Sequence, residues 1–261
     1  MAPPCNGQAT DAAAILGQFS QRLGAMIEGN RPVGLELVRQ QLGDATHYPV
    51  PVTAPHLERL DASTLYTSCC ESVVVVGKVY KCDKCGRWHT TAASGFAIAE
   101  DGVIVTSYHV VAQDERSEGI AVRTWDGRLM TVRNVLAASK THDLVILRVD
   151  GDGLVPLPIR DEGPIGSEVF CISHPVSRFY TMTQGIVAGY YRGKRRTEMA
   201  ITADFAKGSS GAPVLDSTGA VVGIARATST VYHEIKDGVA TQPQMVWKYC
   251  VPSAGLLELL W

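Results

Sequence analysis

Two adjacent serines lie between two glycines in the stretch Gly208–Gly211, which follows Asp204 and precedes an apolar run. Because glycine adopts backbone dihedral angles that side chains forbid, such a loop can aim two amide N–H groups at one point and present a hydroxyl beside them. That arrangement can stabilise an oxyanion and deliver a nucleophile. The same composition is also typical of an ordinary flexible turn, so the loop indicates catalysis only if it has partners elsewhere.

A histidine and an aspartate occur upstream, each at the end of an apolar run. His109 follows the run Gly102–Ser107, and Asp143 precedes the run Leu144–Val149. An imidazole that titrates near neutrality can remove the proton of a serine hydroxyl, and a carboxylate on its other nitrogen fixes the tautomer and stabilises the imidazolium. The order histidine, aspartate, serine therefore predicts nucleophilic catalysis, and the alternative is three unrelated loops.

The motifs Thr-Ser-Tyr-His-Val-Val, His-Asp-Leu-Val-Ile-Leu and Gly-Ser-Ser-Gly-Ala-Pro resemble those of the chymotrypsin-like serine proteases, in particular the bacterial high-temperature-requirement branch. The resemblance implies a mainly β fold of two antiparallel six-stranded barrels, with the catalytic groups in the cleft between them. It implies that Ser210 is the nucleophile, His109 the general base and then acid, and Asp143 its partner. It places the oxyanion hole at the N–H groups of Gly208 and Ser210, and we expect no cofactor in catalysis.

Departures from the family pattern concern activation and specificity. Ser209 stands where zymogen-activated relatives have an aspartate, so we expect no cleavage to be needed for activity. By the same mapping Asp204 lies near the base of the primary specificity pocket, where a carboxylate would favour Lys or Arg. It could instead bind local backbone N–H groups. Arg226, on the strand expected to line that pocket, could neutralise Asp204 or select acidic residues, and we interpret His142 as a solvated neighbour of Asp143.

Seven cysteines occur, and Cys82, Cys85 and His89 form a compact cluster. Two thiolates in a Cys-x2-Cys turn and a nearby imidazole are typical ligands of a structural zinc ion. A fourth ligand from Cys69 or Cys70 would require a bend, because a straight strand from Cys70 to Cys82 would span up to about 40 Å. Disulfides and free thiols stay open as alternatives. Two others, Cys171 and Cys250, lie in apolar runs and are interpreted as small buried hydrophobes.

The elements that must position these groups follow from periodicity. Residues 11–29 predict an amphipathic helix with Asp11 as N-cap, and Pro32–Leu42 a shorter one, before a proline-rich extended linker. We expect this extension, residues 1–62, to pack on the protease domain, residues 63–261; the alternative is an arm for homo-oligomerisation through the helices.

Barrel one is expected at about 63–155 and barrel two at about 156–255, with a short helix at the end. The expected strands are Ser72–Tyr80, Ala93–Ala99, Val103–Ser107, Ile120–Thr124, Leu129–Ala138, Leu144–Val149, Glu168–Ser173, Gly185–Tyr191, Met199–Thr202, Pro213–Leu215 and Val221–Ala227.

Composition limits the class of protein. The 261 residues are 46% hydrophobic with a net charge of −2, which is typical of a globular protein and gives no indication of nucleic-acid binding. No apolar run is long enough to span a membrane, and no signal peptide is visible. The family resemblance favours a periplasmic or secreted location.

The sequence therefore predicts a serine endopeptidase that acts on polypeptides through an acyl-enzyme. The alternatives are a catalytically silent binding protein on the same fold, and an esterase-type acyl hydrolase.

Overall fold

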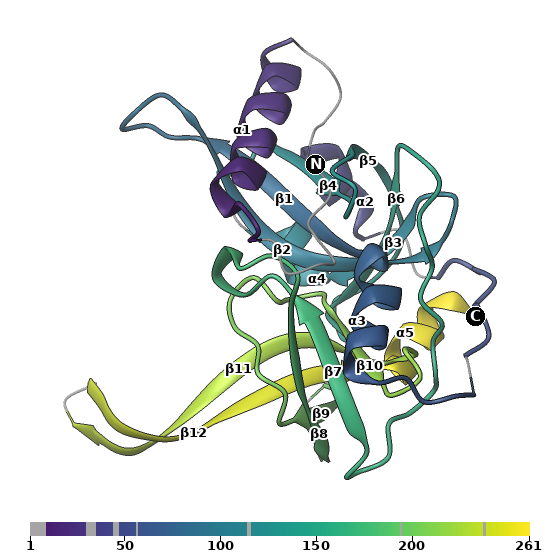
Figure 1. Cartoon of the computed structure of the whole chain (residues 1–261). Coiled ribbons are helices and arrows are strands. Elements are labelled where there is room, and N and C mark those ends of the chain that lie inside the picture. The colour runs from purple at the N-terminus through teal and green to yellow at the C-terminus, as the bar shows by residue number, and fades with distance from the viewer. Residues whose placement is uncertain are drawn as a thin grey trace.

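We describe a computed structural model of the chain, which places residues 9–29, 35–43, 47–55, 57–113, 116–193, 195–236 and 239–261. Strands dominate it, in two closed antiparallel barrels of six strands each (Figure 1). The two barrels confirm the predicted fold class. None of the helices in these residues is long and apolar enough to cross a membrane.

Barrel one contains the first six strands, in the order β1-β2-β3-β6-β5-β4. Its strands are β1 (Val73–Lys81), β2 (Trp88–Ala99), β3 (Val103–Ser107), β4 (Gly119–Arg123), β5 (Leu129–Ser139) and β6 (Leu144–Val149). Nearly every residue of β3 and β6 is buried, because these strands face the barrel core on one side and other elements on the other. Both strands have the predicted bounds.

Barrel two closes in the order β10-β11-β12-β9-β8-β7. Its strands are β7 (Glu168–Ser173), β8 (Thr181–Arg192), β9 (Thr197–Ile201), β10 (Pro213–Asp216), β11 (Val221–Lys236) and β12 (Val239–Pro252). Cys171 and Cys250 are fully buried in its core, as predicted for small hydrophobes. Burial raises the pKa of the Cys171 thiol to about 12.

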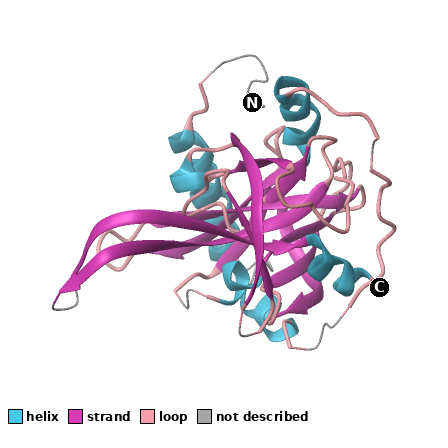
Figure 2. Cartoon of the chain, turned by 90° about the horizontal axis from the view of Figure 1, so that it is seen from below, coloured by secondary structure: helices cyan, strands magenta, loops and turns pink. Residues whose placement is uncertain are grey.

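Helices cover the barrels and the junction between them (Figure 2). They are α1 (Ala12–Glu28), α2 (Leu35–Gln41), α3 (Ala62–Cys69), α4 (Tyr108–Ala112) and α5 (Ser253–Leu260), with short 3-10 turns at Cys70–Ser72 and Pro175–Ser177. The Asp11 side chain caps α1 by accepting a hydrogen bond from Ala14 N at 3.0 Å. The predicted start of the second helix at Pro32 lies outside the described residues.

The apolar stripe of α1 packs on barrel one, as predicted for the extension. Ile15, Phe19 and Leu23 are buried there. The Phe19 ring lies against Gly77 of β1, where an added Cβ would come within 2.3 Å of the ring. The alternative use of this helix in homo-oligomerisation stays a prediction.

The helix α3 is a correction, because β-rich sequence was expected from residue 63. The Asp61 side chain accepts hydrogen bonds from Ser63 N (3.0 Å) and Thr64 N (3.1 Å), and this N-cap begins a helix that buries Leu65 and Cys69. The strand expected from Ser72 then begins at Val73.

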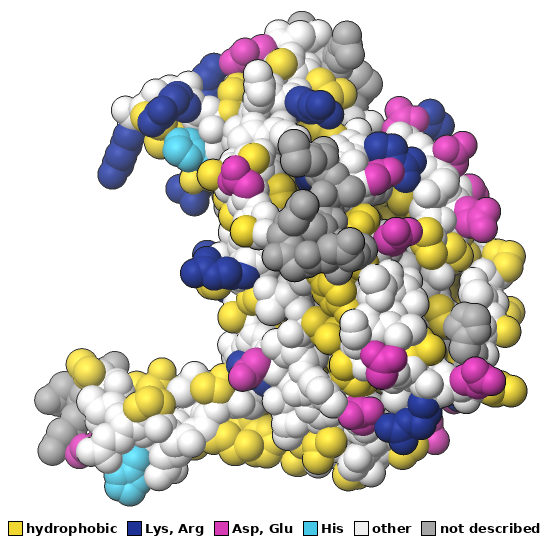
Figure 3. Space-filling model, viewed as in Figure 1, with side chains coloured by type: hydrophobic (Ala, Val, Ile, Leu, Met, Phe, Trp, Pro, Cys, Tyr) yellow, Lys and Arg dark blue, Asp and Glu magenta, His cyan; other side chains and the backbone are white. Residues whose placement is uncertain are grey.

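The hairpin of β11 and β12 is a second correction, because the strand expected to end at Ala227 continues to Lys236. The two strands stay paired from Gly223↔Pro252 to Lys236↔Val239. Their outer part projects from the body as an arm (Figures 1 and 3). Large apolar side chains on the arm are exposed: Val231, Tyr232, Val239, Met245 and Val246.

Candidate active site

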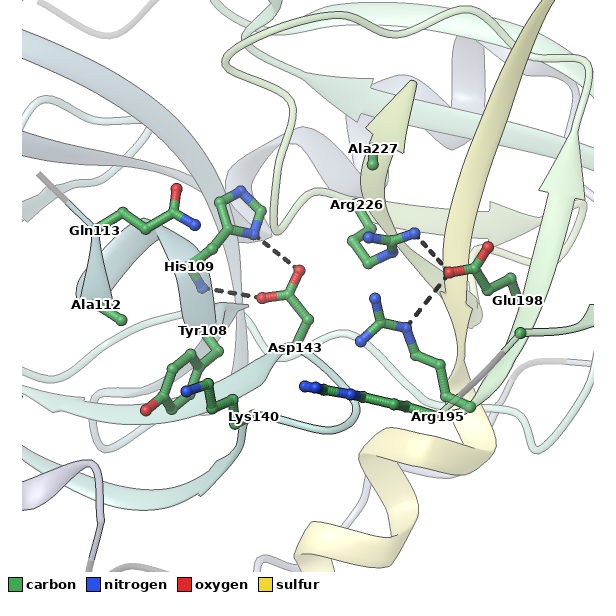
Figure 4. Close-up of a pocket in the computed structure, with 12 residues that line it drawn as sticks. Tyr108, His109, Ala112, Gln113, Lys140, Asp143, Arg195, Glu198, Arg226 and Ala227 are labelled. Carbon is green, nitrogen blue, oxygen red and sulfur yellow. Dashed lines mark hydrogen bonds and ion pairs between the residues drawn. The ribbon is translucent and has the colours of Figure 1, made fainter. Parts of the chain in front are cut away.

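His109 and Asp143 meet at one end of barrel one. Strand β3 leads into the turn of helix α4 that carries His109, and Asp143 precedes the neighbouring strand β6. The carboxylate receives two hydrogen bonds: His109 N lies 2.9 Å from Oδ1, and His109 Nδ1 lies 2.8 Å from Oδ2 (Figure 4). This geometry orients Nδ1–H toward Asp143 and leaves Nε2 as the nitrogen that can accept a proton. Asp143 has φ 59°, a conformation that non-glycine residues seldom adopt outside functional or tightly constrained sites.

The Gly208–Gly211 loop lies against barrel one. Gly208 and Gly211 have φ of 100° and 86°, which explains the need for glycine at both positions. A Cβ on Gly211 would meet both Ser94 O and Thr106 Oγ1 at 2.4 Å. Since Thr106 lies in the strand that leads to His109, this close approach places the serine loop beside the histidine turn.

The two serines of the loop have different environments. The Ser209 hydroxyl is buried and lies 2.9 Å from Ser173 Oγ. Ser210 is half-buried, and its Oγ donates to the Arg226 carbonyl at 3.3 Å. Neither Ser210 Oγ nor His109 Nε2 is hydrogen-bonded to the other in the part of the chain that the structure describes. Ser209 thus has a structural partner, whereas Ser210 bonds a backbone oxygen at the cavity wall.

Two amides of the serine loop differ from their neighbours in their hydrogen bonding. Within the described ranges, the N–H groups of Gly208 and Ser210 donate no hydrogen bond to a protein atom. Their neighbours are engaged: Ser209 N donates to Ala206 O and Gly211 N to Ala225 O, both at 2.9 Å. The unengaged pair is the pair that the sequence predicts as the oxyanion hole.

Ser94 and His174 help to position the Gly208–Gly211 loop through hydrogen bonds. Neither residue was predicted from the sequence. Ser94 Oγ accepts from His174 N at 3.1 Å and donates to Gly208 O at 2.8 Å, while Ser94 N donates to Ser210 O at 3.0 Å. The buried His174 ring lies 3.1 Å from Val74 O through Nε2 and accepts from Tyr180 N at 3.0 Å through Nδ1. Burial lowers the pKa of His174 to about 4, so the ring is neutral near pH 7.

The two specificity candidates do not meet. The Asp204 side chain is 83% exposed and pairs with Lys248 Nζ at 3.1 Å. Arg226 Nη2 instead pairs with Glu198 Oε1 at 2.6 Å, because the neighbouring strand β9 places that carboxylate beside it. The alternative in which Arg226 neutralises Asp204 is therefore wrong.

The interpretation of His142 as solvated is also wrong. Its Nε2 lies 3.1 Å from Glu258 Oε2, and its side chain is only 25% exposed. The ring packs closely against Gly255 of α5, which covers it.

A cavity of about 860 Å³ opens beside the histidine–aspartate pair. His109 and Asp143 form one wall, and the β8–β9 hairpin and β11 form another (Figure 4). Its remaining polar lining includes four cationic side chains: Lys140, Arg195, Arg196 and Arg226. The first three were not predicted from the sequence, because they come from loops that only the folded barrels bring together.

The cluster of Cys82, Cys85 and His89 forms at the tip of the β1–β2 hairpin. One ligand atom from each lies within 4.8 Å of the others, and Cys85 Sγ is 3.2 Å from His89 Nε2. Hydrogen bonds, first from His89 and then from the backbone of Arg87, lower the pKa of Cys85 to about 6. The donor set and its convergence fit a zinc ion.

The predicted fourth ligands lie elsewhere. Cys69 and Cys70 are buried, and they precede strand β1 in the chain. Cys69 Sγ lies 4.0 Å from Gly219 O of barrel two. The unbroken strand β1 (9 residues) lies between these cysteines and the hairpin tip and spans up to about 30 Å at about 3.3 Å per residue. They therefore cannot complete the cluster within one chain.

Comparison with known proteins identifies the family of the domain that contains this site. Residues 93–224, half of the chain, match the family model of the trypsin-like peptidase domain. A "Probable periplasmic serine endoprotease DegP-like" of Halomonas elongata is 36% identical over 141 residues, which is 50% of this chain and 28% of that protein. "Protease Do-like 1, chloroplastic" of Arabidopsis thaliana is 32% identical over 147 residues, which is 51% of this chain and 32% of that protein. The chain thus covers less than a third of each of these two relatives.

A similar fold occurs among solved structures. The "HtrA-type protease AlgW with tripeptide" aligns with a TM-score of 0.60 and 19% identity, covering 74% of this chain and 60% of that one. At this identity the likeness shows a common fold.

Proposed function

Because the chain belongs to the trypsin-like peptidase family, we propose that it is a serine endopeptidase that uses Ser210, His109 and Asp143. One observation carries the proposal: His109, whose ring and backbone amide each form a hydrogen bond with Asp143, lies beside a loop that offers a hydroxyl and, among the described residues, two unengaged amides. The polypeptide substrates are part of the proposal.

The reaction requires the Ser210 side chain to leave its hydrogen bond to the Arg226 carbonyl. Its Oγ turns from the Arg226 carbonyl toward His109 Nε2, which takes the proton as Oγ attacks the scissile carbonyl carbon. The Gly208 and Ser210 amides donate to the resulting oxyanion. The imidazolium then returns the proton to the leaving amine, and water, activated by the same imidazole, hydrolyses the acyl-enzyme. Asp143 keeps the ring oriented and stabilises its charge throughout.

Labelling with a fluorophosphonate tests the nucleophile. We expect one label per chain in the wild type and none in Ser210→Ala, together with loss of casein hydrolysis. Ser209→Ala is the matched control, because that hydroxyl is buried against Ser173 and should leave the label in place. Undiminished labelling of Ser210→Ala would assign the nucleophile to another residue.

Two competing functions give different results in the same assay. A silent binding protein would take no label although it is folded. An esterase-type hydrolase would take the label and cleave p-nitrophenyl esters but not casein or peptides. Activity without cleavage at the start of the first barrel, expected because Ser209 is neutral, stays a prediction.

We further propose that Cys82, Cys85 and His89 hold a structural zinc ion at the hairpin tip, apart from the chemistry. Bound zinc would fix the tip and shield the low-pKa Cys85 thiol. Protein purified without added metal should contain about one zinc per chain, and Cys85→Ser should lose it while His233→Gln, on the arm, should not. Absence of stoichiometric zinc from the wild type, with no protection of Cys85 from iodoacetamide on adding zinc, would contradict the proposal.

A further inference from the structure

The cavity beside His109 has an excess of positive charge. Its two carboxylates are already engaged, since Asp143 binds His109 through both oxygens and Glu198 pairs with Arg226 at 2.6 Å. The same Glu198 oxygen lies 3.6 Å from Arg196 Nε, so one carboxylate serves two guanidinium groups. The cavity therefore contains more cations than its own acids can neutralise.

Two cations of the lining are exposed to solvent. In the part of the chain that the structure describes, Lys140 and Arg195 form no ion pair or hydrogen bond. Figure 4 shows both side chains on the same side of the cavity, below Asp143. Because both are solvent-exposed, an incoming anion can reach them without displacing a protein group.

The two arginines behind them increase this surplus. Arg196 and Arg226 are mostly buried, and their Nε atoms have no hydrogen-bond acceptor among the described residues. Burial, followed by repulsion from Arg226, lowers the pKa of Arg196. Such a wall favours any anion bound in front of it.

The cavity also adjoins the residues proposed to react, His109 and Ser210. His109 lines it, and the carbonyl of Arg226, another lining residue, accepts the hydrogen bond of Ser210 Oγ. An extended peptide advances by about 3.3 Å per residue, so side chains within a few residues of the cleaved bond can reach the cations.

We propose that this cavity is a subsite for an acidic side chain of the substrate, with Lys140 and Arg195 as the groups that bind its carboxylate. The inference rests on the proposed endopeptidase function and specifies the substrate class. A glutamate or aspartate near the cleaved bond gains charge-assisted hydrogen bonds that the isosteric amide lacks. We expect about a tenfold preference for the acid, and its decline at high salt because the pairs are solvent-exposed.

Paired peptides test the subsite. A set of internally quenched peptides carries Glu or Gln at each of the four positions on either side of the cleaved bond, in otherwise identical sequences. The wild type should show a Glu-over-Gln ratio in kcat/KM of about ten at one position at least, falling toward one in 0.5 M NaCl. Lys140→Gln/Arg195→Gln should bring that ratio to about one. Arg192→Gln, a surface control on the same hairpin, should keep it.

The reciprocal variant and a labelling control complete the experiment. Lys140→Glu/Arg195→Glu should reverse the preference toward Lys over Gln at the same position. Equal cleavage of Glu and Gln peptides by the wild type, or a preference that survives both double variants, would overturn the subsite alone. Failure to label Ser210 and to cleave any peptide would instead overturn the proposed function, and the subsite with it.

Discussion

Gly211 shows how single residues decide whether the site can form. It has φ 86°, and Ser94 O and Thr106 Oγ1 occupy the space that a side chain would need. We expect Gly211→Ala to lower the free energy of unfolding by about 2 kcal/mol or more, through strain and steric overlap, and to abolish fluorophosphonate labelling. Urea denaturation measures the first effect.

A matched glycine provides the control. Gly17 lies in helix α1 with no atom within 4 Å of the added Cβ, so Gly17→Ala should raise the free energy of unfolding by up to about 1 kcal/mol. Equal effects of the two substitutions would refute the close approach at Gly211.

His174 makes the stability of the protein depend on pH. Its pKa is about 4 in the folded protein against an ordinary value of 6.5, so between these values the unfolded chain binds more protons. The contribution of the neutral ring is present above pH 6.5 and is lost as the pH falls toward 4, and it amounts to about 3 kcal/mol. Protonation would give Nδ1 a hydrogen where Tyr180 N now donates.

Urea denaturation at several pH values tests this dependence. The free energy of unfolding should fall less steeply between pH 7 and pH 4.5 in His174→Gln than in the wild type. His233→Gln, on the exposed arm, should keep the wild-type slope. A wild-type slope in His174→Gln would show that the acid sensitivity has another origin.

At the residue scale, the sequence predicted the groups with a local signature. His109, Asp143 and the serine loop each end or begin an apolar run, so short motifs identify them. Ser94, His174 and Arg195 have no such signature. Their roles depend on contacts between residues far apart in the chain, such as Ser94 with Gly208, and no spacing encodes these.

At the element scale, helix α1 packs tightly on barrel one at Gly77. An Ala Cβ at Gly77 would come within 2.3 Å of the Phe19 ring, and the other atoms nearest to it belong to the same ring. We expect Gly77→Ala to destabilise the protein, and Phe19→Ala to cost about 3–5 kcal/mol through loss of a fully buried ring.

The double variant distinguishes a specific clash from general damage. In Phe19→Ala/Gly77→Ala the added methyl group enters space that the ring has left, so the double variant should be no less stable than Phe19→Ala alone. Urea denaturation of the three variants gives the coupling free energy. Additive losses would contradict the contact.

The elements that were predicted correctly have strong local patterns. α1 has a clear cap and stripe, and β3, β6 and β7 are short apolar runs between turns. The arm was missed because its exposed strands have no buried face, so the alternation that marks a half-buried strand is absent beyond Ala227. α3 was missed because a single N-cap, Asp61, determines it within β-rich surroundings.

At the scale of the whole molecule, the sequence predicted two antiparallel barrels, since strand spacing and family resemblance agree on them. It did not predict which hydrogen bonds connect the two barrels. Three hydrogen bonds made by Ser94 of barrel one go to His174, Gly208 and Ser210 of barrel two. Strand patterns describe each barrel separately and contain no information about such a junction.

The proposed reactive groups lie on both sides of that junction, with His109 and Asp143 in barrel one and Ser210 in barrel two. A cut in the exposed segment Gly151–Gly153 would leave imidazole and carboxylate on one fragment and the alcohol on the other. Neither fragment alone should react with a fluorophosphonate, and reactivity should return only when fused partner proteins bring the fragments together. The fold would then serve as a split reporter, whose signal measures the proximity of two other proteins in solution.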